Sequence, residues 1–474
     1  MHPETTSHRL DALTRSLQQH DQAHLLEHID TLDEDALTTL VDELETLDLD
    51  EIGRLTSGIA HESTDEAGDA PNLQPAPYIT RDEAAAFRKA GEDLIAGGGV
   101  AAFTVAGGQG TRLGWNGPKG TFPATPITGK PLFQVFAEQI VAAERKYGVE
   151  IPWYVMTSPL NDAATRSFFA DNNFFGKAEA SISMFPQGVM PAVDFNGRLL
   201  MEDAAHLAVS PDGHGGSLRA LRRSGSLEDM QNRGITAISY FQVDNPNVHV
   251  LDPLFLGAHV GHPDSSGEMS SKMVPKAEAG EKVGVFCKVG DRVQVIEYSD
   301  LDPELAAATD AEGRLRFLSG SIALHVLGVE FVDRLTAPGS TTALPFHQAR
   351  KKVPCWNSET REAIKPTEPN GIKFEMFVFD ALEFAERSIV LETDRVEEFA
   401  PIKNAEGTDS AQTSQDLQVE RAARWIESVG GSAPRSEDGT VNATIEIKAE
   451  TALSADDLDP KSVPEINPGD SVLF

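Results

Sequence analysis

The chain has 474 residues, of which 40% are apolar, and its formal net charge is −34 at pH 7. This length provides for two or three domains with a large core, and the charge disfavours nucleic acids and anionic membranes as partners. No apolar run approaches the ~18 residues of a membrane span, and the first residues lack the pattern of a secretory signal.

The cysteine count bears on the cellular compartment, and the distribution of charge bears on the kind of ligand that the protein can bind. Cys287 and Cys355 are too few for a disulfide scaffold or a cysteine-based zinc site, so we expect a cytoplasmic protein. Residues 1–70 hold 18 acidic and 3 basic side chains, which leaves the middle of the chain much less acidic. A locally basic pocket for an anionic small molecule is therefore compatible with the net charge. The sequence does not determine the oligomeric state, and a monomer is the simplest expectation.

Residues 1–75 are predicted to form an acidic helical segment followed by a linker. Leucines recur at helical spacing between residues 10 and 47, whereas residues 61–77 contain three prolines and no Lys or Arg. His20, His24 and His28 recur every four residues and would share one helix face. A metal stripe is one interpretation, but we favour a solvated face because no carboxylate or cysteine accompanies the three histidines at a fixed place.

A second segment, residues 76–400, is predicted to be the catalytic domain. Thr80-x-x-Glu83 has the pattern of a capping box, and the helix that it opens would end at the three glycines of residues 97–99. The apolar run of residues 100–106 then predicts a buried strand.

The strand runs directly into a glycine-rich loop, GGQGTRLG at residues 107–114. Four glycines in eight residues let the backbone approach a ligand closely, and successive N–H groups in such a loop form an anion cradle. Arg112 adds a planar fork of donors and Lys119 a point charge. The glycine spacing differs from that of a P-loop and from that of a dinucleotide fingerprint. The stretch nevertheless indicates a nucleotide-phosphate site.

Strands and helices alternate after this loop. A helix is predicted from Pro131 to Lys146, a strand at residues 151–156, a helix at residues 161–171 and a strand at residues 234–243. Such alternation indicates an α/β fold with a mainly parallel sheet, whose ligands bind beyond the carboxyl ends of the strands. Turn signals predict hairpins across Asn196-Gly197 and across Gly290-Asp291, and a further strand at residues 389–392. Residues 401–474 are predicted to form a small C-terminal α+β module.

Eight blocks in the same order resemble the eukaryotic-type UDP-sugar pyrophosphorylases, and they cover roughly residues 80–405. The first is AGGQGTRLG followed by PKG, and the others are IPWYVMTS (151–158), FPQGVMPA (185–192), SPDGHGG (210–216), QVDN (242–245), VIEYSD (295–300), PNGIKFEMFVFD (369–380) and FAPIKN (399–404). One glycine loop is a weak signal, but eight colinear blocks are a strong one.

The resemblance implies a Rossmann-like nucleotidyltransferase core with a mainly parallel mixed sheet, and uridylyl transfer from UTP to a sugar 1-phosphate. An oxygen of the sugar phosphate attacks the α-phosphorus of UTP in line, and pyrophosphate leaves. The protein must align two polyanions and offset the charge that builds up at the reacting phosphate. No general base is required, because the attacking oxygen is already ionised. The expected cofactor is Mg²⁺ (or Mn²⁺), held by a carboxylate and by the phosphates.

The resemblance also implies roles for individual residues. Asp244 is expected to hold the metal ion, although a helix cap before Pro246 is the plainer alternative, and the amide of Gln187 offers the donor and acceptor that a uracil edge demands. The residues expected to act on the reacting phosphates are Arg112, Lys119 and Lys373. The UTP-binding residues are Val105, Ala106, Gly107, Gly108, Gly110, Lys119, Gln187, Gly213, Asp244 and Lys373. The sugar-phosphate-binding residues are His214, Glu297, Tyr298, Ser321, Phe377, Phe379 and Lys403.

Two residues of the expected sugar pocket depart from the acetylhexosamine branch of the family. That branch usually has Asn at the position of His214 and at the position of Ser321, whereas the UDP-glucose branch has a related block with His. The overall resemblance makes N-acetylglucosamine 1-phosphate the leading acceptor, and these two departures make glucose 1-phosphate or a broader set of sugar phosphates the alternative. The alternative from another class of function is a sensor that binds UDP-sugars without catalysis. Phe377 and Phe379 would share one face of a strand. Packing in the core explains such a pair nearly as well as contact with the sugar does.

Overall fold

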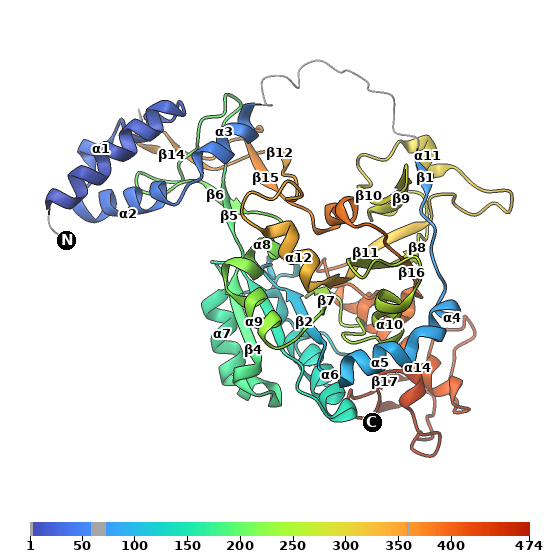
Figure 1. Ribbon diagram of the computed structural model, residues 1–474. Helices are drawn as coiled ribbons and strands as arrows, with labels where there is room; N and C mark the ends of the chain where they lie inside the picture. Colours follow the sequence, from blue (N-terminus) through green and yellow to red (C-terminus); the bar gives the residue numbers. More distant parts are fainter. Residues whose placement is uncertain (1–2, 58–72, 358–359) are drawn as a thin grey trace. The chain divides into compact units, whose positions relative to one another are not determined.

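The computed structural model describes residues 3–57, 73–357 and 360–474, which fall into two compact units (Figure 1). The smaller unit comprises Met1–Ala70, Gly188–Gly216 and Leu344–Val378, and the larger unit comprises Pro71–Gln187, Ser217–Ala343 and Phe379–Phe474. The N-terminal helices thus form one unit with two later segments, and residues 401–474 belong to the larger unit. These units divide the chain differently from the predicted segments 1–75, 76–400 and 401–474. The predicted linker falls largely on residues 58–72, outside the described residues.

A ten-stranded mixed sheet organises the larger unit, in the order β1-β9-β11-β7-β2-β3-β4, with β10 on β9, β8 on β11 and β16 on β8. Strands β7, β2, β3 and β4 are mutually parallel, whereas β11 is antiparallel to β7, β8 and β9. The strands are β1 (Gln74–Pro75), β2 (Val100–Val105), β3 (Trp153–Thr157), β4 (Ile182–Pro186), β7 (Ala237–Gln242), β8 (Met269–Pro275), β9 (Val285–Val289), β10 (Arg292–Ile296), β11 (Ser319–Gly328) and β16 (Val390–Glu392). The predicted α/β class with a mixed sheet is confirmed.

Helices flank this sheet (Figure 1), and their apolar faces form one core with it. β2 is buried up to its last residue, the half-buried Val105, and Phe133 and Phe136 of α6 are fully buried in the core. The helices of the larger unit are α4 (Arg81–Ala84), α5 (Arg88–Ala96), α6 (Leu132–Tyr147), α7 (Asp162–Asp171), α9 (Ser226–Asn232), α10 (Pro253–Gly261), α11 (Pro303–Ala307), α12 (Val329–Thr336), α13 (Arg395–Glu398) and α14 (Ala411–Ser428); α8 (Gly216–Arg223) begins with the last residue of the smaller unit's middle segment.

Several local predictions are confirmed. Thr80 and Glu83 form both bonds of the capping box. The helix predicted from Pro131 is present as α6, which begins one residue later, at Leu132. β9 and β10 pair as the predicted hairpin. The hairpin across Asn196-Gly197 is present as a bridge between the residues that flank the turn, and Gly197 has a φ of +81°.

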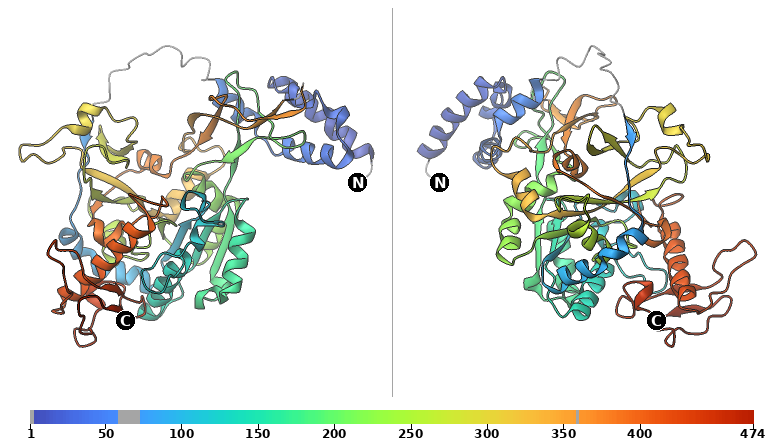
Figure 2. Two further views of the ribbon diagram at one scale, coloured as in Figure 1. Left: turned by 180° about the vertical axis from the view of Figure 1, so that it is seen from behind. Right: turned by 45° about the vertical axis from the view of Figure 1, so that its right-hand side comes forward.

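The C-terminal residues pack on the helices that flank the sheet. Lys146 of α6 lies 2.6 Å from Asp457, and Figure 2 shows the C-terminal residues beside α5 and α6. Glu446 of β17 (Thr444–Glu446), which pairs with β18 (Ser471–Leu473), accepts bonds of 2.9 Å from the N–H groups of Ile127 and Thr128. The C-terminal strand pair therefore fixes the segment that leads from the glycine loop to α6.

The smaller unit joins three N-terminal helices to short strand pairs. Its core combines Leu17 and Leu44 of the helices with Val193, Ile372 and Phe374 of the later segments. The elements are α1 (Pro3–Gln19), α2 (Glu34–Glu45), α3 (Leu49–Ser57), β5 (Val189–Pro191), β6 (Val209–Pro211), β12 (His347–Lys351), β13 (Cys355–Asn357), β14 (Glu362–Ile364) and β15 (Gly371–Glu375). β5 pairs with β6, β12 with β15, and β13 with β14.

The predicted helix face of three histidines is wrong, because α1 ends at Gln19 and Asp21 has a φ of +56°. His24 bonds to the carbonyl of Leu199 at 2.9 Å, and His28, which is 4% exposed, bonds to the carbonyl of Ala204 at 2.7 Å. These two histidines therefore fasten the N-terminal segment to residues 188–216, and they form neither a solvated face nor a metal stripe.

Candidate active site

The parallel strands place the predicted UTP residues at one edge of the sheet. The register pairs Val105 at the end of β2 with both Met156 of β3 and Gln242 of β7, and pairs Thr157 with Pro186 of β4. The glycine loop, Gln187 and Asp244 each follow one of these strand ends within two residues. This edge is therefore the place where the fold gathers the residues that the sequence associated with UTP.

Short backbone bonds shape the glycine loop. Gly110 donates to the carbonyl of Gly117 at 2.9 Å, and Lys119 donates from its backbone to the carbonyl of Gly108 at 3.0 Å. Among the described residues, we find no acceptor for the N–H groups of Gly107 and Gln109. Two N–H groups without an internal partner, one of them on an exposed residue, are what an anion cradle requires.

Two glycines of the loop lie in close contact with neighbouring side chains. A Cβ atom at Gly110 would lie 2.7 Å from Cβ of Trp115, and one at Gly107 would lie 2.9 Å from the amide oxygen of Gln187. Both distances are shorter than van der Waals contact. The loop thus packs directly against the side chain that the sequence assigned to uracil recognition.

Lys119 and Asp244 form an ion pair at this edge. The ammonium of Lys119 lies 3.2 Å from the carboxylate of Asp244, and these side chains are only 16% and 14% exposed. Burial alone would raise the pKa of Asp244, but Lys119 and Lys403 together lower it below its ordinary range. Lys403 is held near Asp244, because its neighbour Ile402 donates to the carbonyl of Asp244 at 2.8 Å. Asp244 is therefore an ionised carboxylate between two lysines.

The other predicted cation of the loop is placed differently. Arg112 lies in the short 3₁₀ turn Thr111–Leu113 and is exposed. Within the described part of the chain it forms no ion pair, so its guanidinium is available to an anionic ligand.

The sugar-side residues of the larger unit gather around one glycine. Ser321 of β11 donates from its backbone to the carbonyl of Gly284 at 2.8 Å, and a Cβ atom at Gly284 would lie 3.5 Å from a carboxylate oxygen of Glu297. Tyr298 is 48% exposed, so its ring is accessible to a ligand. The structure thus brings Glu297 and Ser321 to the same glycine, and Tyr298 follows Glu297 directly in the chain.

The two phenylalanines do not share a strand face, so that prediction is wrong. β15 ends at Glu375, and Phe379 lies in the 3₁₀ helix Val378–Phe384 and is 8% exposed. Phe377, just before that helix, packs instead between two imidazoles, with ring centroids 5.4 Å from His214 and 4.6 Å from His347. The 3₁₀ helix breaks the alternation on which the shared face depended.

The smaller unit holds the remaining predicted residues. Gly213 has a φ of +82°, and a Cβ atom there would lie 2.3 Å from the carbonyl oxygen of Met376. Lys373 is half-buried in β15, opposite Ala349 of β12. His214 accepts a bond from the N–H of Val378 at 3.1 Å through Nδ1, which makes Nε2 the protonated nitrogen of the neutral ring. The loop at residues 212–216 is therefore fixed against residues 376–378.

We expect His214 to make the stability of the protein depend on pH. Burial lowers the pKa of His214 to about 4, from an ordinary value of about 6.5. Below pH 6.5 the unfolded chain therefore binds a proton that the folded chain rejects, and stability falls as the pH falls from 6.5 towards 4. In His214→Asn the free energy of unfolding should decline less over this interval, by at most about 3 kcal/mol. Urea unfolding at pH 7 and pH 4.5 measures the difference, and equal declines in the two proteins would contradict the role of His214.

Two buried asparagines near the sheet edge were not recognised as site residues in the sequence. Asn161 donates to the carbonyls of Ala106 at 3.0 Å and Gly108 at 3.3 Å. Asn245 donates to the carbonyl of Glu398 at 2.6 Å and accepts from the N–H of Ala400 at 3.0 Å. In the sequence, Asn161 marks only the start of a predicted helix, and Asn245 is only part of the QVDN block. No spacing in the sequence predicts the bonds of these two asparagines, because their partners are backbone groups up to 155 residues away.

The candidate site offers the carboxylate of Asp244 to a metal ion. Over residues 3–57, 73–357 and 360–474, no three His, Cys, Asp or Glu side chains come together as a metal site. Mg²⁺ usually keeps several waters and binds through one or two carboxylates together with substrate phosphates. An ionised Asp244 beside an anion cradle fits this mode of binding.

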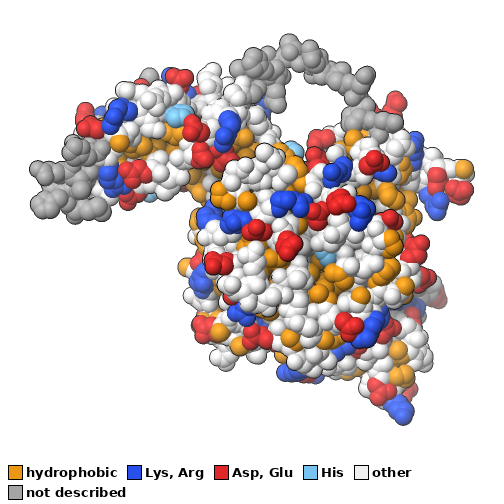
Figure 3. All heavy atoms as spheres, in the orientation of Figure 1, with side chains coloured by type: hydrophobic (Ala, Val, Ile, Leu, Met, Phe, Trp, Pro, Cys, Tyr) orange, Lys and Arg blue, Asp and Glu red, His pale blue; other side chains and the backbone are white. Residues whose placement is uncertain are grey.

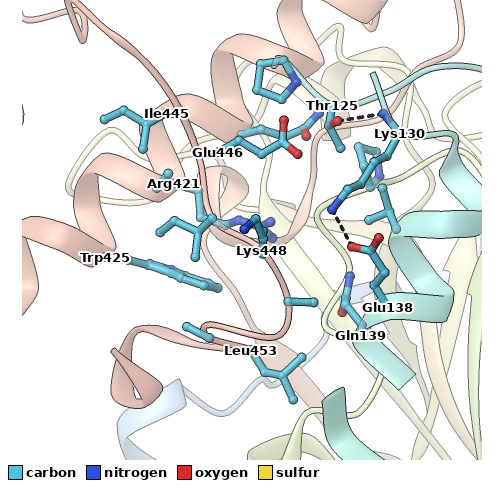
Figure 4. Close-up of a pocket in the computed structure, with 18 of the residues that line it drawn as sticks. Thr125, Lys130, Glu138, Gln139, Arg421, Trp425, Ile445, Glu446, Lys448 and Leu453 are labelled. Atoms are coloured by element: carbon cyan, nitrogen blue, oxygen red, sulfur yellow. Dashed lines mark hydrogen bonds and ion pairs between the residues drawn. The ribbon is translucent and has the colours of Figure 1, made fainter. Parts of the chain in front are cut away.

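Elsewhere in the larger unit, a pocket between α14 and the start of α6 has its polar groups already engaged (Figure 4). Lys130 pairs with Glu138 at 2.7 Å, and Glu446 binds the backbone of residues 127 and 128. On the face seen in Figure 3, acidic and basic side chains are interspersed. Among the described residues we find no helix with the length and apolar character of a membrane-spanning segment.

Comparison with known proteins identifies a consistent set of relatives. A family model described as UTP–glucose-1-phosphate uridylyltransferase matches residues 80–425. The chain is 36% identical over 384 residues to the UDP-N-acetylglucosamine pyrophosphorylase of Saccharomyces cerevisiae, an alignment that covers 78% of this chain and 80% of that protein. It is 37% identical to UDP-N-acetylglucosamine diphosphorylase 1 of Arabidopsis thaliana, over 72% of this chain and 68% of that protein.

A solved structure shares the fold. The crystal structure of the uridine diphosphate N-acetylglucosamine pyrophosphorylase from Trypanosoma brucei in complex with inhibitor superposes with a TM-score of 0.78 at 24% identity. The superposition covers 95% of this chain and 94% of that chain. At this identity the match bears on the fold alone.

Proposed function

The chain belongs to the UTP–glucose-1-phosphate uridylyltransferase family, and from this premise we propose that it transfers the uridylyl group of UTP to N-acetylglucosamine 1-phosphate. The observation that carries the proposal is the sheet edge where the glycine loop, Gln187 and the Lys119–Asp244 pair lie together. The names of the yeast and Arabidopsis relatives support the choice of acceptor.

In this proposal the protein binds and orients two polyanions and supplies no nucleophile of its own. A phosphate oxygen of the sugar phosphate forms the new bond to the α-phosphorus. The bond from that phosphorus to the bridging oxygen of the β-phosphate breaks, and pyrophosphate carries the electron pair away. N–H groups of the glycine loop bind the phosphates of UTP, and Lys119 offsets the charge that builds up as the bond breaks. Arg112, exposed at the same loop, and Lys403, beside Asp244, add to the cationic field.

Asp244 is the residue that would hold Mg²⁺, which when bound would neutralise phosphate charge as a Lewis acid. The ionised state of this carboxylate is maintained by Lys119 and Lys403. The assignments of Gly213, His214, Lys373 and Phe377 in the smaller unit remain predictions from the sequence, as do those of Glu297, Tyr298, Ser321 and Phe379. A monomeric cytoplasmic enzyme also remains a prediction.

Pyrophosphate release from UTP and Mg²⁺ tests the proposal, with N-acetylglucosamine 1-phosphate, N-acetylgalactosamine 1-phosphate and glucose 1-phosphate as parallel acceptors. We expect release with the N-acetyl sugars to exceed release with glucose 1-phosphate. A preference for glucose 1-phosphate would identify that sugar phosphate as the acceptor. It would also indicate that His214 and Ser321 change the specificity, and these residues would then be the ones to substitute.

The assay also separates an enzyme from the second candidate function, a sensor of UDP-sugars. A sensor would bind UDP-N-acetylglucosamine in calorimetry and release no pyrophosphate with any of the three acceptors. The Lys119–Asp244 pair favours the enzyme, because a sensor could lose either residue and still bind a UDP-sugar, whereas this chain keeps both.

A further inference from the structure

Asn161 occupies the N-cap position of α7, but its side chain does not cap the helix. Asparagine is among the preferred N-cap residues, because its side-chain oxygen can accept a bond from an N–H group of the first turn. Here that oxygen accepts from the N–H of Ser158 at 2.7 Å, a residue outside the helix. The carboxamide is therefore used for something other than helix capping.

The amide nitrogen of Asn161 holds two carbonyl groups of the glycine-loop region. It donates to Ala106 at 3.0 Å and to Gly108 at 3.3 Å, and the side chain is 1% exposed. The carbonyl of Gly108 also accepts from the backbone N–H of Lys119 at 3.0 Å. One buried amide thus connects both ends of the loop, because Ala106 precedes the glycines and Lys119 follows them.

These two carbonyls determine where the neighbouring N–H groups point. In a planar trans peptide the N–H of one residue is directed opposite to the C=O of the residue before it. Carbonyls of Ala106 and Gly108 that face Asn161 therefore direct the N–H groups of Gly107 and Gln109 away from Asn161. These are the two N–H groups for which the described residues provide no acceptor.

We propose that Asn161 is a positioning residue that holds the glycine loop in the conformation that binds the phosphates of UTP. This inference rests on the proposed function, since it takes the phosphates of UTP as the ligand of the loop. Without the amide, the peptides after Ala106 and Gly108 are free to rotate, and binding must then order them. The loss falls mainly on the phosphates, because the carboxamide of Asn161 bonds to Ser158, Ala106 and Gly108 and forms no hydrogen bond with Gln187.

The test compares binding of UTP and of uridine by calorimetry in the absence of any sugar phosphate, so that no turnover occurs. Asn161→Ser and Asn161→Thr keep a residue able to cap α7 and remove the amide. We expect the dissociation constant of UTP to rise at least about tenfold in both variants, because two hydrogen bonds that order the loop are lost. The dissociation constant of uridine, which has no phosphate, should change less than about twofold.

Thr157→Val is the matched control, because it removes the bond of 2.6 Å from Thr157 to Asp162 at the start of α7 without touching the glycine loop. This variant should bind UTP and uridine as the wild-type protein does. If the Asn161 variants fold and bind UTP normally, or lose UTP and uridine binding equally, the inference is overturned while the proposed function stands. If the wild-type protein binds no UTP, the proposed function fails first and the inference fails with it.

Discussion

Lys119→Ala is expected to lower kcat by about a hundredfold to a thousandfold, the loss typical of removing one group that stabilises charge in a transition state. Lys119 is held at the sheet edge by a backbone bond to Gly108 and by the ion pair of 3.2 Å with Asp244. An ammonium fixed in this way needs no rearrangement as negative charge moves to the leaving pyrophosphate. Initial rates of pyrophosphate release at saturating UTP and sugar phosphate measure the effect.

The same substitution should destabilise the fold more than removal of an exposed lysine would. Lys119 is 16% exposed, and its loss leaves Asp244 with Lys403 as its neighbouring cation. We expect a decrease of about 1–2 kcal/mol in the free energy of unfolding, below the 3–5 kcal/mol that a fully buried pair costs when one partner is removed. Urea denaturation measures it, and thermal scans confirm that the variant is folded in the assay.

Lys89→Ala is the matched control, because Lys89 also pairs with an aspartate but lies on the surface of α5, 77% exposed. It should leave kcat and stability unchanged, since exposed pairs contribute about 0–1 kcal/mol. Normal turnover by a folded Lys119→Ala enzyme would remove Lys119 from the reaction and leave it as a structural counterion of Asp244.

The parallel half of the fold was predictable from the sequence because its signals are local. The apolar run at residues 100–106, the glycines that follow and the helix after Pro131 are each specified within about a dozen residues, and all three are present. The antiparallel half was less predictable. β11 pairs with β7, β8 and β9, but a register shift between Ser321 and His325, with a φ of +54° at Ala323, interrupts the alternation by which strands are recognised.

The distinction between local signals and contacts that are distant in the sequence applies to the candidate site as well. Asp244 and Lys119 were recognised because each lies in a motif at a strand end or a loop, and the sheet brings them to 3.2 Å. The roles of Asn161 and Asn245 were not recognised, because a carboxamide that binds backbone carbonyls leaves no pattern in the sequence. The prediction for the histidines at residues 24 and 28 was wrong for the opposite reason. Their spacing in the sequence is regular, but the helix ends at Gln19, before either of them. Spacing predicts contacts only where the backbone remains regular.

Asp244→Asn is expected to lower kcat by about a hundredfold or more and to raise the Mg²⁺ concentration required for half-maximal activity. The variant keeps the size of the side chain and removes the charge that Lys119 and Lys403 maintain by lowering the pKa of Asp244. Because this pKa lies below its ordinary range, the wild-type carboxylate is ionised throughout the neutral range. The loss should therefore be the same at pH 6.5 and pH 8.5. Asp93→Asn, which removes a carboxylate 63% exposed on α5, is the matched control. It should change neither kcat nor the Mg²⁺ concentration required for half-maximal activity.

The Mg²⁺ titration distinguishes a metal ligand from a counterion. If Asp244 serves only to orient Lys119, Asp244→Asn lowers kcat but leaves the Mg²⁺ requirement unchanged. In that case the double variant Lys119→Ala/Asp244→Asn is no slower than Lys119→Ala alone, because residues that act as a pair are not additive. If Asp244 also holds the cation, the requirement rises in Asp244→Asn whether or not Lys119 is present, and the double variant is slower than either single variant. The second result is expected, because the carboxylate is 14% exposed and keeps a low pKa against the effect of burial, as a ligand for a hard cation must.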